Sequence, residues 1–325
     1  MSTAESGITV GMPVRNGMPW LPEAIESLLG QTTDAFEILV IADPSTDKSI
    51  DYLHNLRDPR LRIVEQAQAG LTATLNRLLQ EARTPWLARM DADDVSYPTR
   101  IEKLQAEIRA HPNAGLIYSL ADYHPRERCA GRFRCSRGTP EELRSIVERG
   151  YLLSFCHSTV ALHVDKVQGA GGYRAGIRAE DADLWWRMAR RCEIRCIPEP
   201  LVGFRQHAES LSSEDTGREE LAGLYVQYLL LSELWGREPR PLDEVTQALL
   251  EFLRPSTVKA KDSLRRFNMH LAQGHRGRGL RALAKAVLAS PAYVVRRALD
   301  EFRHGTIANG AAPQLFWERK EVLWT

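Results

Sequence analysis

The sequence has no long hydrophobic run, and neither sign of charge dominates it. No stretch approaches the roughly eighteen apolar residues of a membrane-spanning helix, and the first residues, MSTAESGITV, lack a secretory signal pattern. The 43 Lys and Arg residues balance 42 Asp and Glu residues, so the net charge of +1 does not draw the chain to nucleic acid or anionic lipid. We therefore expect a cytoplasmic globular protein that binds no nucleic acid.

Cysteine is also scarce. The five cysteines are odd in number, and their spacing with the histidines does not match a zinc ribbon, so we expect reduced thiols. The 325 residues are 43% hydrophobic and 26% charged, which is typical of a globular protein with material for a large core. This length suits one large domain with an appendage, or two domains.

Strand-like and helix-like segments alternate through the first half of the chain. Short β-rich runs occur at 8–12, 37–42, 61–64, 86–90 and 114–118. Segments with helical periodicity lie between them, at 20–29, 48–56, 71–82 and 97–110. Such alternation predicts an α/β fold with parallel strands joined by right-handed crossovers.

Polar side chains follow three of these strands directly. The clusters are Pro13–Asn16, Asp43–Asp47 and Asp91–Asp94. In open α/β sheets, ligands bind beyond the carboxyl ends of the strands. The sequence therefore predicts that these three clusters meet at one edge of the sheet and form the binding site.

The pattern changes twice after residue 120. Residues 122–139 have the composition of a loop, and a glycine-rich stretch at 169–172 precedes a predicted helix at 181–191. From about residue 217 the sequence predicts helix after helix. We therefore predict an α/β domain at 1–215 and a helical region at 216–325 that makes oligomer, membrane-surface or other partner contacts.

The cluster at 91–94 places Asp91, Asp93 and Asp94 within four positions, where like charges repel. A divalent cation would relieve this repulsion, because Mg²⁺ and Mn²⁺ prefer carboxylate oxygens. The alternative is a solvated loop in which Asp94 or Ser96 caps the following helix.

Several motifs, in this order and spacing, resemble the family 2 glycosyltransferases. This resemblance covers roughly residues 7–212, says little about 217–325, and implies the GT-A nucleotide-sugar-binding fold with inverting, metal-dependent transfer. The matching motifs are PVRN at 13–16, IADPSTDKS at 41–49, AGLTATLNRLL at 69–79, MDADD at 90–94, CHSTVALHVDKVQGAGGY at 156–173, AEDADLWWRM at 179–188 and PEPLVGFRQH at 198–207.

The resemblance implies a divalent cation, Mn²⁺ or Mg²⁺, that bridges the diphosphate of the sugar donor. Asp93 is the expected direct ligand. Asp91 is expected either as a second ligand or as a contact to the ribose. His207 matches a C-terminal histidine that completes metal or diphosphate binding, and its alternative role is an ordinary polar surface residue.

The resemblance also implies a donor site at the ends of the first strands. Pro13 and Arg15 are expected to line the base or ribose, Asp43 to contact the nucleoside, and Asn76 to occupy a polar position of the nucleotide site. The family often has DDGSTD where this chain has Ala42-Asp43-Pro44-Ser45-Thr46-Asp47. One acid and the glycine are missing, which leaves the identity of the base open.

Asp181 matches the aspartate that is usually the general base in this family. It would take the proton from the acceptor hydroxyl as that oxygen attacks the anomeric carbon. Glu180, His157 and Trp185 are expected near the acceptor or the diphosphate. Their alternative roles are a favourable acidic helix start for Glu180, a satisfied buried histidine for His157, and a core residue for Trp185.

The tail from Lys259 to Arg303 carries eleven Lys and Arg residues against three acidic residues, a local net charge of +8. Within it, residues 276–303 have the pattern of a basic amphipathic helix, which is typical of peripheral contact with an anionic membrane face. The alternative is a helix whose apolar stripe packs on the catalytic domain while its basic face is solvated. That stripe consists of Leu280, Leu283, Val287 and Leu288.

The sequence thus predicts an inverting hexosyltransferase-like enzyme of polysaccharide or glycoconjugate synthesis. Its partners would be a nucleoside diphosphate sugar and a saccharide or lipid-linked saccharide acceptor, and a homo-oligomer is compatible with this function. A sugar-phosphate nucleotidyltransferase would carry a Gly-rich basic loop after the first strand, and a dehalogenase-like phosphatase would carry its D-x-D there. A non-catalytic nucleotide-sugar-binding protein would not need Asp181.

Overall fold

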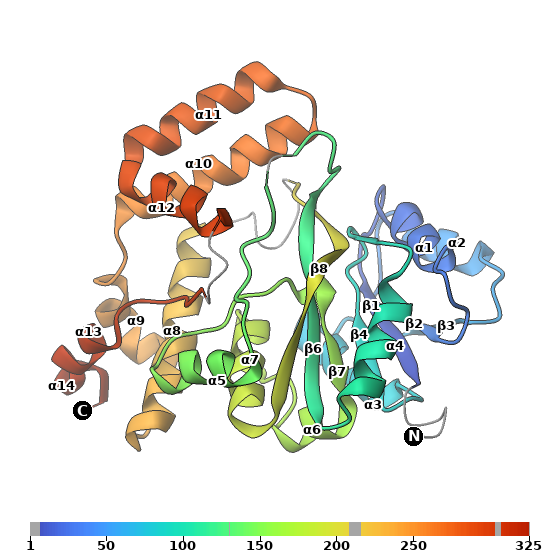
Figure 1. The fold of residues 1–325 in the computed structure, drawn as a ribbon, viewed down its shortest axis with the longest axis horizontal. Coiled ribbons are helices and arrows are strands. Elements are labelled where there is room, and N and C mark those ends of the chain that lie inside the picture. Colours follow the sequence, from blue (N-terminus) through green and yellow to red (C-terminus); the bar gives the residue numbers. More distant parts are fainter. Residues whose placement is uncertain (1–6, 130, 208–215, 303–306, 325) are drawn as a thin grey trace. The chain divides into compact units, whose positions relative to one another are not determined.

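The computed structural model describes residues 7–129, 131–207, 216–302 and 307–324 (Figure 1). The chain forms two compact units. The first consists of Met1–Asp122, Phe155–Ala175 and Arg187–Arg205, and the second contains the remaining residues. The units interleave along the chain, and residue 215, where the sequence predicts a domain boundary, lies outside the described residues.

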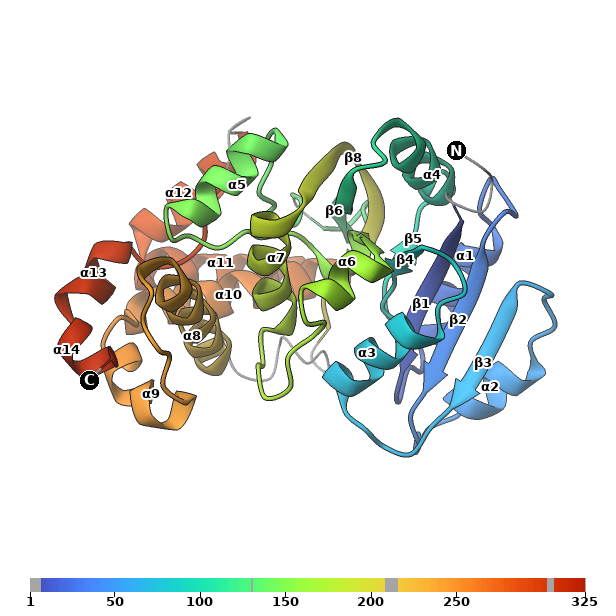
Figure 2. The same ribbon diagram turned by 90° about the horizontal axis from the view of Figure 1, so that it is seen from below.

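One half of the sheet is parallel, as predicted. Its strands are β1 (Ile8–Val14), β2 (Glu37–Ala42), β3 (Leu61–Glu65) and β4 (Trp86–Arg89), in the order β3-β2-β1-β4. Figure 2 shows β1, β2 and β3 side by side. Because their carboxyl ends meet at one edge, the predicted α/β fold and its polar edge are confirmed in this half.

The other half of the sheet is mixed, and the expectation of parallel strands throughout is wrong there. β7 (Ala161–His163) pairs antiparallel with both β4 and β6 (Ala114–His124). The chain leaves β6 and returns to insert β7 between β4 and β6. β8 (Glu193–Arg205) pairs antiparallel with the short β5 (Val95–Ser96).

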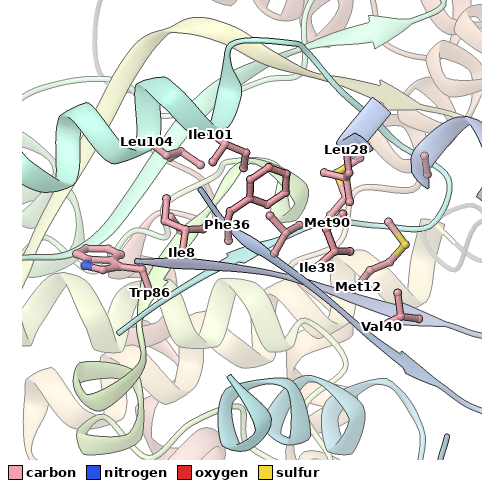
Figure 3. Close-up of a cluster of buried hydrophobic side chains, with 14 of the residues drawn as sticks. Ile8, Met12, Leu28, Phe36, Ile38, Val40, Trp86, Met90, Ile101 and Leu104 are labelled. Carbon is pink, nitrogen blue, oxygen red and sulfur yellow. The ribbon is translucent and has the colours of Figure 1, made fainter. Parts of the chain in front are cut away.

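The two faces of the parallel half are covered by different helices. α1 (Leu21–Leu29) and α4 (Arg100–Ala110) pack on the same face, where Figure 3 shows Leu28 and Ile101 with side chains of β1, β2 and β4. Alternate β1 residues point to the opposite face. There, a side chain at Gly11 would lie 2.7 Å from Leu87 and 3.2 Å from Leu78 of the helix α3 (Leu71–Glu81). A larger residue at position 11 would therefore displace the side chains of Leu87 and Leu78.

The remaining elements are mostly helical. In the part of the chain that the structure describes, none of the helices is both long and apolar enough to cross a bilayer. These elements are α2 (Ser49–Asn55), α5 (Pro140–Glu148), the 3₁₀ turn η1 (His157–Thr159), α6 (Val164–Gly169), α7 (Glu180–Arg191), α8 (Thr216–Trp235), α9 (Leu242–Leu250), α10 (Pro255–Ala272), α11 (Arg276–Ala289), α12 (Pro291–Phe302), α13 (Pro313–Glu318) and α14 (Lys320–Trp324).

A buried glutamine joins three segments of the second unit. Gln227 of α8 is fully buried, and its Nε2 donates to the carbonyl oxygens of Gly150 and Ala311, each at 2.8 Å. Its Oε1 accepts from the Ala311 N–H, also at 2.8 Å. Beside it, a core forms from residues of α8, α9, α13 and α14. The side chain thus satisfies backbone groups that would otherwise be buried without partners.

We expect Gln227→Leu to destabilise the protein although the new side chain has a similar size. Three backbone groups lose their partner, and each buried unsatisfied group costs about 1–3 kcal/mol, so the free energy of unfolding should fall by about 3 kcal/mol or more. Urea denaturation measures this change. Gln247→Leu on the exposed face of α9 is the matched control and should stay within about 0.5 kcal/mol of the wild type. Equal stabilities of the two variants would contradict this role of Gln227.

Candidate active site

The loops after β1 and β2 are tied together by hydrogen bonds. Asn16, whose φ is 51°, accepts from the Thr46 N–H at 2.8 Å through its side-chain oxygen. The N–H of Asn16 in turn donates to the Ser45 hydroxyl at 3.0 Å. Two of the three predicted polar clusters therefore lie in contact at the edge of the sheet.

Asp47 holds the same two loops from the other side. Its carboxylate accepts from the N–H groups of Met18 and Ser49, each at 2.9 Å. Burial acts to raise the pKa of Asp47, but hydrogen bonds from Ser49 and Met18 outweigh it, so the pKa is lowered. Because both of its carboxylate oxygens accept hydrogen bonds from backbone N–H groups, Asp47 holds the loops after β1 and β2 together and does not face a ligand.

Asp43 lies at the end of β2 and is buried. It accepts a 2.7 Å hydrogen bond from Gln66, which follows β3 and also donates to Thr74 at 2.8 Å. With its amide oxygen turned toward Arg15, Gln68 accepts from both terminal nitrogens of that guanidinium at 3.2 Å. Neither glutamine was predicted as a site residue, although each follows the third strand at the predicted polar edge.

The acidic cluster after β4 brings carboxylate oxygens of Asp91, Asp93 and Asp94 within 4.8 Å of one another. Asp91 forms an ion pair with Arg89, which is only 2% exposed. Asp91 also accepts from the Ser158 hydroxyl at 2.8 Å. Arg89, which lies in β4, therefore neutralises the carboxylate of Asp91, one of the three crowded acids.

Asp94 is the buried member of this cluster, and the alternative that it caps the next helix is wrong. Its Oδ1 accepts from the Arg205 N–H at 2.8 Å, and the residue preceding α4 is Thr99, not Asp94 or Ser96. Burial, followed by the negative charges of Asp93 and Asp91, raises the pKa of Asp94 well above its usual value. Its Oδ2 is buried and receives no hydrogen bond from the described residues.

These observations fit a divalent cation. Hard ions such as Mg²⁺ and Mn²⁺ take carboxylate oxygens as ligands. The buried Oδ2 of Asp94 and the raised pKa of this group indicate negative charge that the protein itself leaves uncompensated. Arg89 and Ser158 both contact Oδ2 of Asp91, so Asp91, Asp93 and Asp94 each have an oxygen that could hold the ion.

Asn76 has a role that the sequence did not predict. Its side-chain nitrogen donates to the Tyr173 carbonyl at 2.8 Å, and its oxygen accepts from the Tyr173 N–H at 2.9 Å. Arg187 donates to the carbonyls of Ala170 at 2.6 Å and Gly172 at 2.7 Å. Both side chains thus fix the glycine-rich loop. The Asn76 amide is used within the protein and was expected to face the nucleotide.

His157 lies in the turn η1, beside this loop. Its Nε2 is 2.9 Å from the Tyr173 hydroxyl. Burial, together with the positive charge of Arg89, lowers the pKa of His157 well below its usual value. The imidazole is therefore neutral at physiological pH, which agrees with the alternative of a satisfied histidine.

The remaining predicted residues belong to the second unit. Glu180 and Asp181 lie half-buried in the first turn of α7, where the Asp181 carboxylate accepts from the Ala182 N–H at 2.6 Å. His207 is half-buried and follows the end of β8 by two residues. Trp185 is 1% exposed and lies among buried side chains, as its alternative role of a core residue requires.

Comparison with known protein sequences finds one family. The model of Glycosyl transferase family 2 matches residues 9–163. The chain is similar to the Bacillus subtilis (strain 168) protein EpsE, with 30% identity over 187 residues that cover 55% of this chain and 66% of EpsE. It is also similar to the O-antigen biosynthesis glycosyltransferase WbnJ of Escherichia coli, with 26% identity over 236 residues that cover 69% of this chain and 89% of WbnJ.

Comparison with solved structures finds the same fold in glycosyltransferases. S. aureus TarS 1–349 in complex with UDP-GlcNAc has a TM-score of 0.57 and 14% identity, covering 94% of this chain and 99% of TarS. The mannosyltransferase PcManGT of Pyrobaculum calidifontis, in complex with GDP-Man and Mn²⁺, has a TM-score of 0.53 and 17% identity, covering 91% of this chain and 84% of PcManGT.

The raised pKa of Asp94 predicts that Asp94→Asn stabilises the metal-free protein at neutral pH. A carboxyl group with a raised pKa in the folded state stabilises that state when protonated, and this contribution is lost as pH rises above the unfolded-state pKa of about 3.9. Asparagine keeps the hydrogen bond from Arg205 without the charge. The variant should be more stable than the wild type by about 1–3 kcal/mol at pH 7, and the difference should shrink toward pH 4.

Urea denaturation in EDTA at both pH values measures this difference. The control is Asp165→Asn, which removes an exposed carboxylate of α6 and should leave stability within about 0.5 kcal/mol of the wild type. If the free energies of unfolding of Asp94→Asn and the wild type differ by the same amount at pH 7 and pH 4, the buried charge of Asp94 does not destabilise the folded protein and the prediction is wrong.

Proposed function

The chain belongs to glycosyltransferase family 2, and on this premise we propose that it transfers a sugar from a nucleoside diphosphate sugar to a hydroxyl group of a saccharide acceptor. The transfer inverts the configuration at the anomeric carbon and contributes to polysaccharide or glycoconjugate synthesis. The observation that carries this proposal is the convergence of Arg15, Asp43 and the acidic cluster at the carboxyl ends of β1, β2 and β4. A nucleoside diphosphate sugar contains both a nucleoside and a diphosphate. At this edge of the sheet, Arg15 and Asp43 are available for the nucleoside, and the acidic cluster is available for the diphosphate through a bound cation.

The donor nucleoside binds over the ends of β1 to β3. Pro13 and Arg15 line the base or ribose, and Asp43 accepts a hydrogen bond from the nucleoside through the oxygen that Gln66 leaves open. The contacts of Gln66 and Gln68 support this role, because they orient Asp43 and Arg15. Pre-oriented polar groups bind a ligand with a smaller loss of entropy.

The diphosphate binds at the acidic cluster with a Mn²⁺ or Mg²⁺ ion, held by Asp93 and Asp94. When bound, such an ion neutralises charge on the leaving nucleoside diphosphate. Asp91 stays paired with Arg89 through Oδ2, and it either adds a second ligand to the ion or contacts the ribose. His207 adds a contact to the ion or the diphosphate. The buried acceptor atom of Asp94 supports a direct contact from this residue as well as from Asp93.

Asp181 acts as the general base. Its carboxylate takes the proton from the acceptor hydroxyl while that oxygen forms the new bond to the anomeric carbon, and the bond to the diphosphate oxygen breaks on the opposite face. Glu180 and His157 contact the acceptor or the diphosphate. The helical region 216–325 supplies acceptor contacts. The position of Asp181 in the first turn of α7, directly after the glycine-rich loop, supports this assignment.

The metal assignment predicts that nucleotide stabilises the protein only together with the ion. In a thermal-shift panel of nucleoside diphosphates and their sugars, the matching base with Mn²⁺ should raise the melting temperature, by about 2–4 °C per kcal/mol of ligand-linked stabilisation. Asp93→Asn should lose the Mn²⁺-dependent shift.

Asp165→Asn carries the same change of charge at a remote site and should keep that shift. If nucleotide stabilises the wild type equally with EDTA, or if Asp93→Asn responds to Mn²⁺ as the wild type does, then the metal assignment is incorrect. The transferase assignment would still stand on the next experiment.

The base assignment predicts a loss of turnover without a loss of binding. Asp181→Asn should lower the rate of sugar transfer, or of donor hydrolysis, by about 10²–10⁴-fold, the usual contribution of a general base. Its affinity for the nucleoside diphosphate should stay at the wild-type value, since Asp181 contacts the acceptor. Release of nucleoside diphosphate measures the rate, and Asp165→Asn should match the wild type. Full activity of Asp181→Asn would exclude it as the base.

A further inference from the structure

Helix α11 exposes its apolar stripe to solvent. Leu280 is 64% exposed and Leu288 is 84% exposed, and Val287 between them is also exposed. On the next helix, α12, Val295 and Leu299 are exposed as well. Most of the exposed large hydrophobic side chains of the described chain thus lie between residues 280 and 299.

The buried face of α11 consists of small residues instead. Gly279, Ala282 and Ala286 are buried, and a side chain at Gly279 would lie 3.3 Å from Leu271 of α10. Figure 1 shows α10 and α11 running side by side. Within its own unit the helix therefore packs on α10 through its small residues, while Leu280, Val287 and Leu288 of the apolar stripe are exposed and Leu283 is half-buried.

Basic residues flank the exposed stripe. Arg278, Arg281 and Lys285 are exposed, and within the described chain no carboxylate forms an ion pair with them. Between residues 263 and 299 the sequence has eight Lys and Arg residues and neither Asp nor Glu. Four residues around the start of α11, with Gly277, line a shallow hollow of about 310 Å³. They are His275, Arg276, Arg278 and Arg281.

We propose that this basic apolar face, made of Arg278, Leu280, Arg281, Lys285 and Leu288, docks on the surface of an anionic phospholipid bilayer. The leucines enter the boundary between headgroups and acyl chains, the basic side chains contact lipid phosphates, and the hollow at the start of α11 receives one phosphate group. A helix with apolar residues along its exposed centre and uncompensated basic residues beside them has the chemistry that anionic membranes bind.

The charge of the face favours a membrane over a second copy of the chain. Two copies meeting through this face would bring like charges together, which is unfavourable at an interface. An anionic bilayer offers negative charge at its surface for the basic side chains, and an apolar layer beneath the headgroups for Leu280 and Leu288. The whole chain carries only +1, so the attraction is local to this face, and it does not depend on the proposed sugar transfer.

Vesicle flotation with the full-length protein tests this proposal. The wild type should float with vesicles of equal parts phosphatidylcholine and phosphatidylglycerol and should stay behind with pure phosphatidylcholine. Binding to the anionic vesicles should weaken with added salt, because exposed charges are screened. Failure of the wild type to float with anionic vesicles at low salt would overturn the proposal.

Two double variants separate the apolar and the charged contributions. Arg278→Gln/Arg281→Gln should weaken binding by about 20- to 30-fold, at roughly fivefold for each basic residue near the surface. Leu280→Ser/Leu288→Ser should weaken it by about tenfold or more, because burial of the leucines contributes to the affinity. The matched controls, Arg109→Gln/Arg144→Gln and Val322→Ser, alter exposed residues elsewhere and should bind as the wild type does.

Further measurements distinguish a membrane from the other possible partners of this face, which are a second copy of the chain and an acidic polypeptide. Circular dichroism should show that all variants are folded, since every altered side chain is exposed. If light scattering shows a wild-type dimer that Leu280→Ser/Leu288→Ser dissolves, the face is an interface between copies and the proposal fails. It also fails if both patch variants float as the wild type does, or if an acidic polypeptide such as polyglutamate binds the wild type while vesicles do not.

Discussion

The repulsion among three carboxylates at the end of β4 is the constraint around which the first unit is organised. Arg89 of β4 reduces this repulsion through its ion pair with Asp91. The buried Arg100 donates a 2.7 Å hydrogen bond to the Arg89 carbonyl oxygen and so holds this residue in place. Burial lowers the pKa of Arg100 to about 10, which still leaves it charged at neutral pH. Arg205 completes the arrangement, since its backbone N–H holds Asp94 and its side chain donates to the Asp93 carbonyl at 2.8 Å. What the protein leaves uncompensated is the negative charge near Asp94.

This requirement makes sense of the mixed half of the sheet. Ser158 precedes β7, and Arg205 ends β8, so both reach the acidic cluster only because these strands lie on the far side of β4. A sheet that continued in parallel order would place other groups there. The loops after β1 and β2 need no such help, because neighbouring parallel strands bring them together directly.

The parts of the site that could be predicted are those that local sequence determines. Strand runs followed by polar residues located Arg15, Asp43 and Asp91 at one edge, since parallel strands share a direction. The partners of these residues could not be predicted, because Arg89 resembles any strand residue and Ser158 is far away in the chain. Asn76 shows the same limit: its polar side chain on a helix suited a nucleotide contact, but it binds the backbone of Tyr173. In the tail, periodicity identified the stripe of α11, whereas only the structure shows that the small residues are the buried ones.

The hydrogen bonds on the glycine-rich loop have a consequence for how the enzyme turns over. Glycines at 171 and 172 adopt positive φ, a backbone conformation that glycine reaches without steric cost. Here Asn76 and Arg187 bind the backbone on either side of Gly171, so the conformational entropy of this turn is lost once, when the chain folds. A substrate that contacts this turn would therefore meet a backbone that is already ordered, so its binding would not have to supply the free energy of ordering it.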